Sequence, residues 1–148
     1  MKAEILNELN QIYESEGVLK PESVVEHASN PESALHGQFT WDDSKAAHEY
    51  RIWQARRLIN VCVTILPTVN KEFRAFVSLE SDRKQKGGGY RCTVDVLGDD
   101  EMRAELLTQA LSELRRIRRQ YETLKELAPV FKAIDKIEAK MPVPLAAH

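Results

Sequence analysis

Six side chains of the kinds that bind metal ions or move protons lie close together in the first third of the chain. They are His27, His36, Asp42, Asp43, His48 and Glu49. Zinc sites on helices use an H-E-x-x-H pair, and these residues do not have that spacing. The chain also lacks a CxxC pair, a G-x-S-x-G turn and a Cys/His nucleophile pattern. The sequence therefore predicts a protein that is not an enzyme and needs no metal or cofactor, with metal binding or acid–base chemistry by this group as the alternative.

A second candidate for chemistry is the segment SDRKQKGGGYR, residues 81–91, in which basic side chains surround three glycines. A phosphate-binding P-loop has the pattern G-x-x-x-x-G-K-[ST] between a strand and a helix. Here the glycines precede a strand-like run, and no Lys-Ser/Thr pair follows them. We therefore interpret residues 81–91 as the flexible loop of a β-hairpin, because glycine permits positive φ.

Polar and basic residues of this loop and of a predicted helix over residues 42–59 are the candidates for nucleic-acid contact. They are Arg51, Gln54, Arg56, Arg57, Arg83, Lys84 and Lys86. Arg and Gln side chains on a helix can reach phosphates and base edges in a major groove. Asp42 and Asp43 at the start of this helix repel phosphate, which favours backbone contact over base reading. The alternative for Arg56 and Arg57 is a solvated basic face that suits the C-terminal end of the helix dipole.

The helix over residues 42–59 must position those side chains, and its apolar residues predict which face is buried. They are Ala46, Ala47, Tyr50, Trp53 and Leu58. Thr40 and Asp43 have the spacing of a capping box at its start. Aromatic rings beside alanines at helical spacing favour a core position, so we expect Tyr50 and Trp53 to pack against a sheet. The alternative is that these rings, with Trp41, stack on bases.

Apolar residues recur at spacings of three and four between residues 101 and 140. They are Leu107, Ala110, Leu114, Ile117, Tyr121, Leu124, Ala128 and Phe131. This spacing is typical of a coiled-coil seam, and it predicts an oligomer interface formed by Leu107, Leu114, Ile117, Tyr121, Leu124 and Phe131. The run RRIRR, residues 115–119, is expected to pair with glutamates such as Glu113 and Glu122, with an acidic partner or nucleic acid as the alternative.

The remaining elements follow from the hydrophobic pattern. Helical spacing predicts short helices over residues 3–15 and 21–28, and a further short helix or a turn is expected over residues 31–38. β-branched or alternating runs predict strands over residues 61–66, 73–79 and 90–97. The fold class is therefore α+β, with N-terminal short helices, a small antiparallel sheet of two to three strands and a long coiled-coil-like C-terminal helix. Helices followed by a hairpin also have the order of a winged helix, with residues 74–97 as the wing.

The same pattern predicts how the chain divides. We expect a globular domain over residues 1–98, an oligomerisation helix over residues 99–140 that is kinked near Pro129, and a tail over residues 141–148. Pro129 must kink the long helix or begin a second one, because proline lacks the amide hydrogen that a helix interior needs. Gly98-Asp99-Asp100 is expected to cap the start of the long helix.

The stretch ALHGQFTWDDSKAAHEYRIWQARRLI, residues 34–59, resembles a family of small uncharacterised proteins of tailed bacteriophages and prophages. The matching positions are Leu35-His36, Phe39, Trp41-Asp42-Asp43, Ala46-Ala47, Tyr50-Arg51 and Gln54-Ala55-Arg56. The preceding GVLKPESVVEHA resembles the same group, so the resemblance covers about a third of the chain. It implies a phage-encoded protein that acts inside the host cell, and it implies no catalytic residues.

Composition limits the functions that remain. A net charge of -2 excludes a uniformly basic protein that coats nucleic acid, so any such contact must come from a local patch. No apolar run is long enough to cross a membrane and no signal peptide is recognisable, so we expect a cytoplasmic protein without membrane contact. The first hypothesis is a DNA-binding or regulatory protein that acts as a dimer or higher oligomer. The second is a protein-interaction or assembly module that binds a host or phage protein through its long helix.

Overall fold

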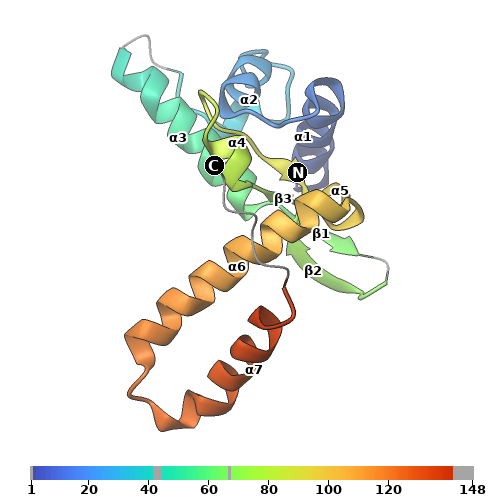
Figure 1. The fold of residues 1–148 in the computed structure, drawn as a ribbon. Helices are drawn as coiled ribbons and strands as arrows, with labels where there is room; N and C mark the ends of the chain where they lie inside the picture. Colours follow the sequence, from blue (N-terminus) through green and yellow to red (C-terminus); the bar gives the residue numbers. More distant parts are fainter. Residues whose placement is uncertain (1, 42–44, 67, 142–148) are drawn as a thin grey trace. The chain divides into compact units, whose positions relative to one another are not determined.

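The computed structural model describes residues 2–41, 45–66 and 68–141. The chain divides into two compact units, Met1–Arg103 and Ala104–His148, and each has its own hydrophobic core. Helices come first, short antiparallel strands follow, and a long helix begins the C-terminal part (Figure 1). The predicted α+β class is therefore confirmed.

The first unit contains most of the elements. They are α1 (Lys2–Glu16), α2 (Pro21–Ala28), the 3-10 helix η1 (His36–Gln38), α3 (Lys45–Val61), β1 (Val63–Leu66), β2 (Lys71–Arg74), β3 (Phe76–Val77), α4 (Glu80–Arg83), β4 (Arg91–Cys92), α5 (Thr93–Gly98) and the first residues of α6 (Asp100–Tyr121). Gly17 ends α1 as expected, with a φ of 73° and an amide that donates to the Tyr13 carbonyl. Residues 31–38 form turns and the 3-10 helix η1, in line with the short helix or turn expected there. The carboxylate of Glu8 on α1 accepts from the Ser33 hydroxyl and the Ala34 amide, which holds this segment in turns.

The core of the first unit is built from α1, α2 and α3. The face of α3 that points into it carries the fully buried Ala55 and Ile59 and the partly buried Ile52, which recur at spacings of three and four. Tyr50 and Trp53 are instead 48% and 50% exposed, so the expectation that they pack against a sheet is wrong. Because Ala55 and Ile59 face the core, the two rings lie on the outer side of α3.

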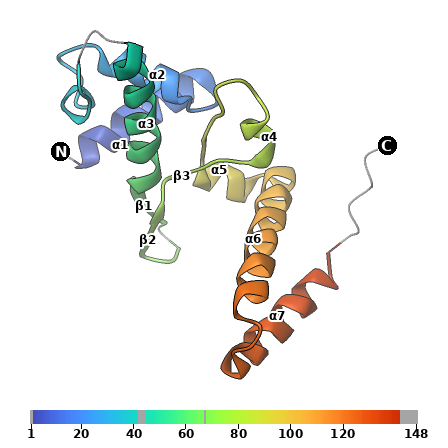
Figure 2. The same ribbon diagram turned by 90° about the vertical axis from the view of Figure 1, so that its left-hand side faces the viewer.

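The strands form two separate pairs rather than one sheet. β1 pairs antiparallel with β2, with Val63 opposite Arg74, and this hairpin continues from the end of α3 (Figure 2). β3 pairs antiparallel with β4, with Phe76 opposite Cys92. The expected pairing of strands 73–79 and 90–97 is therefore reduced to two residues on each side. The winged-helix wing over residues 74–97 is not formed, because α4 and a turn lie between the paired strands.

Residues 93–98 form α5, so the strand predicted there is wrong. The Thr93 amide donates to the Ala75 carbonyl, and its hydroxyl donates to the Arg74 carbonyl at 2.7 Å. These bonds fix the start of α5 against the end of β2. An extended chain would place Val94 and Val96 on the same face, whereas the helix buries Val96 and leaves Val94 exposed.

The cap expected at the start of the long helix is present. The carboxylate of Asp99 accepts from the Met102 amide at 2.8 Å, and Asp100 and Glu101 place negative charge in the first turn of α6. This side chain satisfies one of the amides that a helix start leaves without an intrahelical partner.

The second unit is a helical hairpin. It contains the remainder of α6, the 3-10 helix η2 (Lys125–Leu127) and α7 (Ala128–Glu138). Of the two outcomes expected at Pro129, the second is observed. α6 ends at Tyr121, and Pro129 lies in the first turn of a second helix, α7, where a missing amide hydrogen costs nothing. α7 runs back along α6 (Figure 2). Leu111, Phe131 and Ile134 form the buried core between the two helices.

Candidate interaction surfaces

Two of the four nucleic-acid candidates on α3 hold the chain segment that precedes the helix. The Arg51 guanidinium donates to the Thr40 carbonyl and lies 5.4 Å from the centre of the Trp41 ring. The Gln54 side chain accepts from the Thr40 amide at 3.1 Å and donates to its hydroxyl. These contacts give both side chains a local structural role. Asp42, Asp43 and the proposed capping box lie outside the described residues.

The other two candidates on α3, Arg56 and Arg57, are exposed. The Arg57 guanidinium lies 5.6 Å from the centre of the Trp53 ring, within the range of a cation–π contact. Trp53 also stacks on Tyr50, with ring centres 5.6 Å apart and planes 17° from parallel. An exposed row of tyrosine, tryptophan and arginine therefore lies along the outer side of α3.

Several contacts hold residues 81–91 in place. Asp82 is 2% exposed, and its carboxylate accepts bidentate hydrogen bonds from the Arg91 guanidinium, the shortest at 2.7 Å. Gly87 and Gly88 have φ of 85° and 67°, which favours glycine at both positions. A side chain at Gly89 would collide with Val18, because its Cβ would lie 2.3 Å from a Val18 methyl carbon. The segment therefore connects the paired strands β3 and β4, as expected of a hairpin loop, and it contains part of α4 and a glycine turn.

The cationic side chains of this segment are partly engaged. Arg83 donates to the Ser78 carbonyl at 2.8 Å, and Lys84 forms an ion pair with Glu80 at 3.1 Å. Lys86 is exposed. Of the seven side chains proposed to contact nucleic acid, five therefore already bind groups of their own chain, and the structure does not bring the set together as one free basic surface.

The histidines and carboxylates that could do chemistry do not form a shared site. His36 bonds through Nδ1 to the Ala28 carbonyl and stacks on Trp41, while His27 lies 3.3 Å from the Glu8 carboxylate. His48 and Glu49 are exposed on α3. Across the described residues, no group of three His, Cys, Asp or Glu side chains is arranged to hold a metal ion.

Two titratable groups of α1 have shifted pKa values. Partial burial raises the pKa of Glu8, but hydrogen bonds from Ser33 and the Ala34 amide, together with nearby His27, outweigh it and leave the pKa below its usual value. Burial and a hydrogen bond to the Asp95 carboxylate raise the pKa of Tyr13 to about 12. Both groups join α1 to distant parts of the first unit, and neither opens towards a site.

The residues proposed for oligomerisation have two different environments. Phe131 is buried in the core of the second unit, and Leu114 packs against that core. Exposure is between 42% and 48% for the remaining four, Leu107, Ile117, Tyr121 and Leu124. The arginines of RRIRR also differ from expectation, because Arg115 and Arg118 pair across the hairpin with Glu138 and Asp135, each at 2.5 Å.

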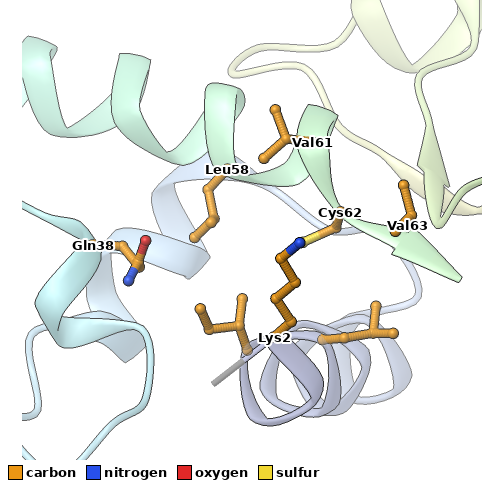
Figure 3. A pocket seen from close by; sticks show the side chains of 8 residues that line it. Lys2, Gln38, Leu58, Val61, Cys62 and Val63 are labelled. Atoms are coloured by element: carbon orange, nitrogen blue, oxygen red, sulfur yellow. The ribbon is translucent and has the colours of Figure 1, made fainter.

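A groove between α1 and the end of α3 is a feature that the sequence pattern did not indicate. Its volume is about 270 Å³, and its apolar lining includes Leu6, Leu58 and Val61. Figure 3 shows Leu58 pointing from α3 into this space and Lys2 extending across it from α1. The spacing of Leu58 and Val61 on one helix, opposite the apolar face of α1, was the available signal.

None of the described helices is both long and apolar enough to cross a bilayer. No protein-family model, curated protein or solved structure matches this chain.

Proposed function

We propose that this protein is a self-associating interaction module whose contact surface is one face of α6. The observation that supports this proposal most strongly is that α6 carries two apolar stripes of which α7 covers only one. Leu111 is 2% exposed beneath α7, whereas Ile117 and Tyr121 are 45% and 42% exposed. Exposed apolar rows of this kind on a small unit are typical of an interaction surface.

The uncovered stripe has the spacing of a helix–helix contact. Its residues, which we call the α6 seam, are Ala110, Leu114, Ile117 and Tyr121. Leu107 lies at the edge of the seam, where it also lines a hollow with Ile137 and Glu138 of α7. Intervals of three and four residues keep the seam on one side of the helix, where each side chain can insert between those of a facing helix. Leu114 belongs to both stripes, because it also packs against the core of the second unit.

A second copy of the chain is the partner that fits this seam best. A two-fold interface brings the same surface together from both copies, and a repeat with coiled-coil spacing is complementary to itself. The hydrophobic core of the second unit is small, because among the described residues only three of its large apolar side chains are buried. They are Leu111, Phe131 and Ile134. Pairing two helical hairpins through the seam would give a four-helix bundle with a larger shared core.

The proposal is tested by placing a charge on the seam. Ile117→Glu should convert the dimer to a monomer, because a carboxylate would have to be buried without a partner. Ser112→Glu is the matched control, since Ser112 is exposed on the same helix outside the seam. Light scattering should give a dimer for wild type and Ser112→Glu and a monomer for Ile117→Glu. A mass that is the same for all three chains would contradict the proposal.

DNA binding has weaker support. Arg51, Arg83 and Lys84 contact groups of their own chain, so freeing them for phosphate would first break those contacts. The wing that would have carried two of them to the duplex is also not formed. We therefore favour the interaction module over a DNA-binding protein.

A further inference from the structure

The groove between α1 and α3 belongs to a longer surface along α3. A second hollow of about 310 Å³ adjoins it and shares the lining residues Gln38, Leu58 and Val61. This second hollow extends past Trp53 to Tyr50. We call the two together the α3 groove. It lies within the first unit, whereas the α6 seam lies in the second.

The composition of the α3 groove is that of a protein-binding surface. Trp53 and Tyr50 are half exposed, and Val61 is 64% exposed. Arg57 covers one part of the Trp53 ring. Tryptophan, tyrosine and arginine are the residues that most often dominate binding energy at protein interfaces, where they fill or line desolvated pockets. Large apolar side chains left exposed in this arrangement indicate a surface that a partner covers.

The charges of the α3 groove are of one sign. Among the described residues that line it, the charged ones are Lys2 and Arg57, and both are cations. A partner that buries the apolar floor must pass close to them. A carboxylate on the partner would satisfy these cations, whereas a lysine or arginine there would be repelled.

We propose that the α3 groove binds an apolar segment of a partner protein that carries a carboxylate next to its apolar anchor. The apolar anchor would contact Leu58 and Val61, and the carboxylate would pair with Arg57. A protein segment fits better than nucleic acid because base stacking needs free ring faces. Tyr50 and Trp53 stack on each other, and Arg57 lies over Trp53.

Fluorescence polarisation with a labelled model peptide tests this inference. The probe is a short amphipathic peptide of leucine, alanine and glutamate, and the comparison is the same peptide with lysine in place of glutamate. The full chain carrying Ile117→Glu is used as well as wild type, so that self-association through the α6 seam cannot account for the result. The glutamate peptide should bind at least about tenfold more tightly than the lysine peptide to both chains. Failure of the glutamate peptide to bind, or equal binding of the two, overturns the inference.

Two charge reversals on one helix locate the contact. Arg57→Glu should weaken binding of the glutamate peptide at least about tenfold, because an attraction becomes a repulsion. Arg56→Glu makes the same change of charge on a neighbouring exposed residue outside the groove lining and should leave binding nearly unchanged. Val61→Glu places a charge on the apolar floor of the groove and should also weaken binding. This variant still tests the contact if Arg57→Glu fails to fold. Equal effects of Arg57→Glu and Arg56→Glu, or displacement of the peptide by a single-stranded oligonucleotide, would overturn the assignment.

Discussion

The ion pair between the buried Asp82 and the partly buried Arg91 joins α4 to β4 across residues 81–91. Asp82 is 2% exposed, and the Arg91 side chain is 25% exposed. Removing one member of a buried ion pair leaves the other without compensation and costs about 3–5 kcal/mol. Because Arg91 keeps some contact with water, we expect Asp82→Ala to lower the free energy of unfolding by about 3 kcal/mol, at the lower end of that range.

Tryptophan fluorescence during denaturant unfolding measures this loss, since Trp41 and Trp53 both lie in the first unit. Lys84→Ala is the control, because it removes an exposed ion pair with Glu80 four residues away on the chain. Such pairs contribute at most about 0.5 kcal/mol. Equal losses for the two variants would show that the pair of Asp82 and Arg91 has no special role.

The lowered pKa of Glu8 gives a pH-dependent expectation. A carboxylate whose pKa is lower in the folded chain than in the unfolded chain stabilises the fold above its usual pKa, and this contribution is lost as the pH falls through the lowered value. Glu8→Gln should therefore be less stable than wild type at neutral pH, and the difference should shrink as the solution is acidified below the usual carboxylate range. Denaturant unfolding over a pH series measures it. Glu14→Gln, at an exposed position of the same helix, is the control, and an equal loss of stability for the two variants at neutral pH would contradict the expectation.

At the scale of elements, the side-chain cap of α6 has its own expected cost. Asp99→Ala removes the carboxylate that accepts from the Met102 amide and should destabilise the start of α6 by about 1 kcal/mol. Asp100→Ala is the comparison, since Asp100 offers only its charge to the helix dipole and should cost less than about 1 kcal/mol. Hydrogen exchange of the first amides of α6 reports the difference. Unchanged protection of the Met102 amide in Asp99→Ala would contradict this expectation.

Elements set by local signals could be predicted from the sequence. Pro21 and Gly17 mark the start of α2 and the end of α1, and Asp99 marks the start of α6. The elements that could not be predicted depend on distant partners. The run from Thr93 to Gly98 has β-branched residues typical of a strand, but bonds from Thr93 to the end of β2 start a helix instead.

The candidate surfaces could be predicted only in part, for a related reason. The spacing of the α6 seam is visible in the sequence, whereas its division between a buried and an exposed stripe depends on α7 folding back. α3 has one apolar stripe that includes Ala55 and another that includes Tyr50 and Trp53, and spacing alone does not tell which of the two faces the core. In the structure Ala55 is buried, and the two rings lie on the outer side. Residue types also could not show that five of the seven candidate side chains for nucleic-acid contact bind groups of their own chain.

At the scale of the whole molecule, each unit carries a surface of its own. The first unit has the α3 groove with its aromatic and cationic lining, and the second has the α6 seam. One chain could therefore pair with its own copy through one unit and hold a different protein through the other. The resemblance of residues 34–59 to small phage proteins stays a prediction, and it would make that second protein a host or phage protein.

Sedimentation equilibrium over a dilution series of the wild-type chain tests self-association through the α6 seam. We expect a mass close to twice the chain mass of 16.9 kDa at high concentration, falling towards the single-chain mass on dilution. Ile117→Glu should give the single-chain mass throughout, and Ser112→Glu should behave as wild type. A wild-type chain that has the single-chain mass at every concentration, or a dimer that survives Ile117→Glu, would show that the α6 seam is not a self-association surface.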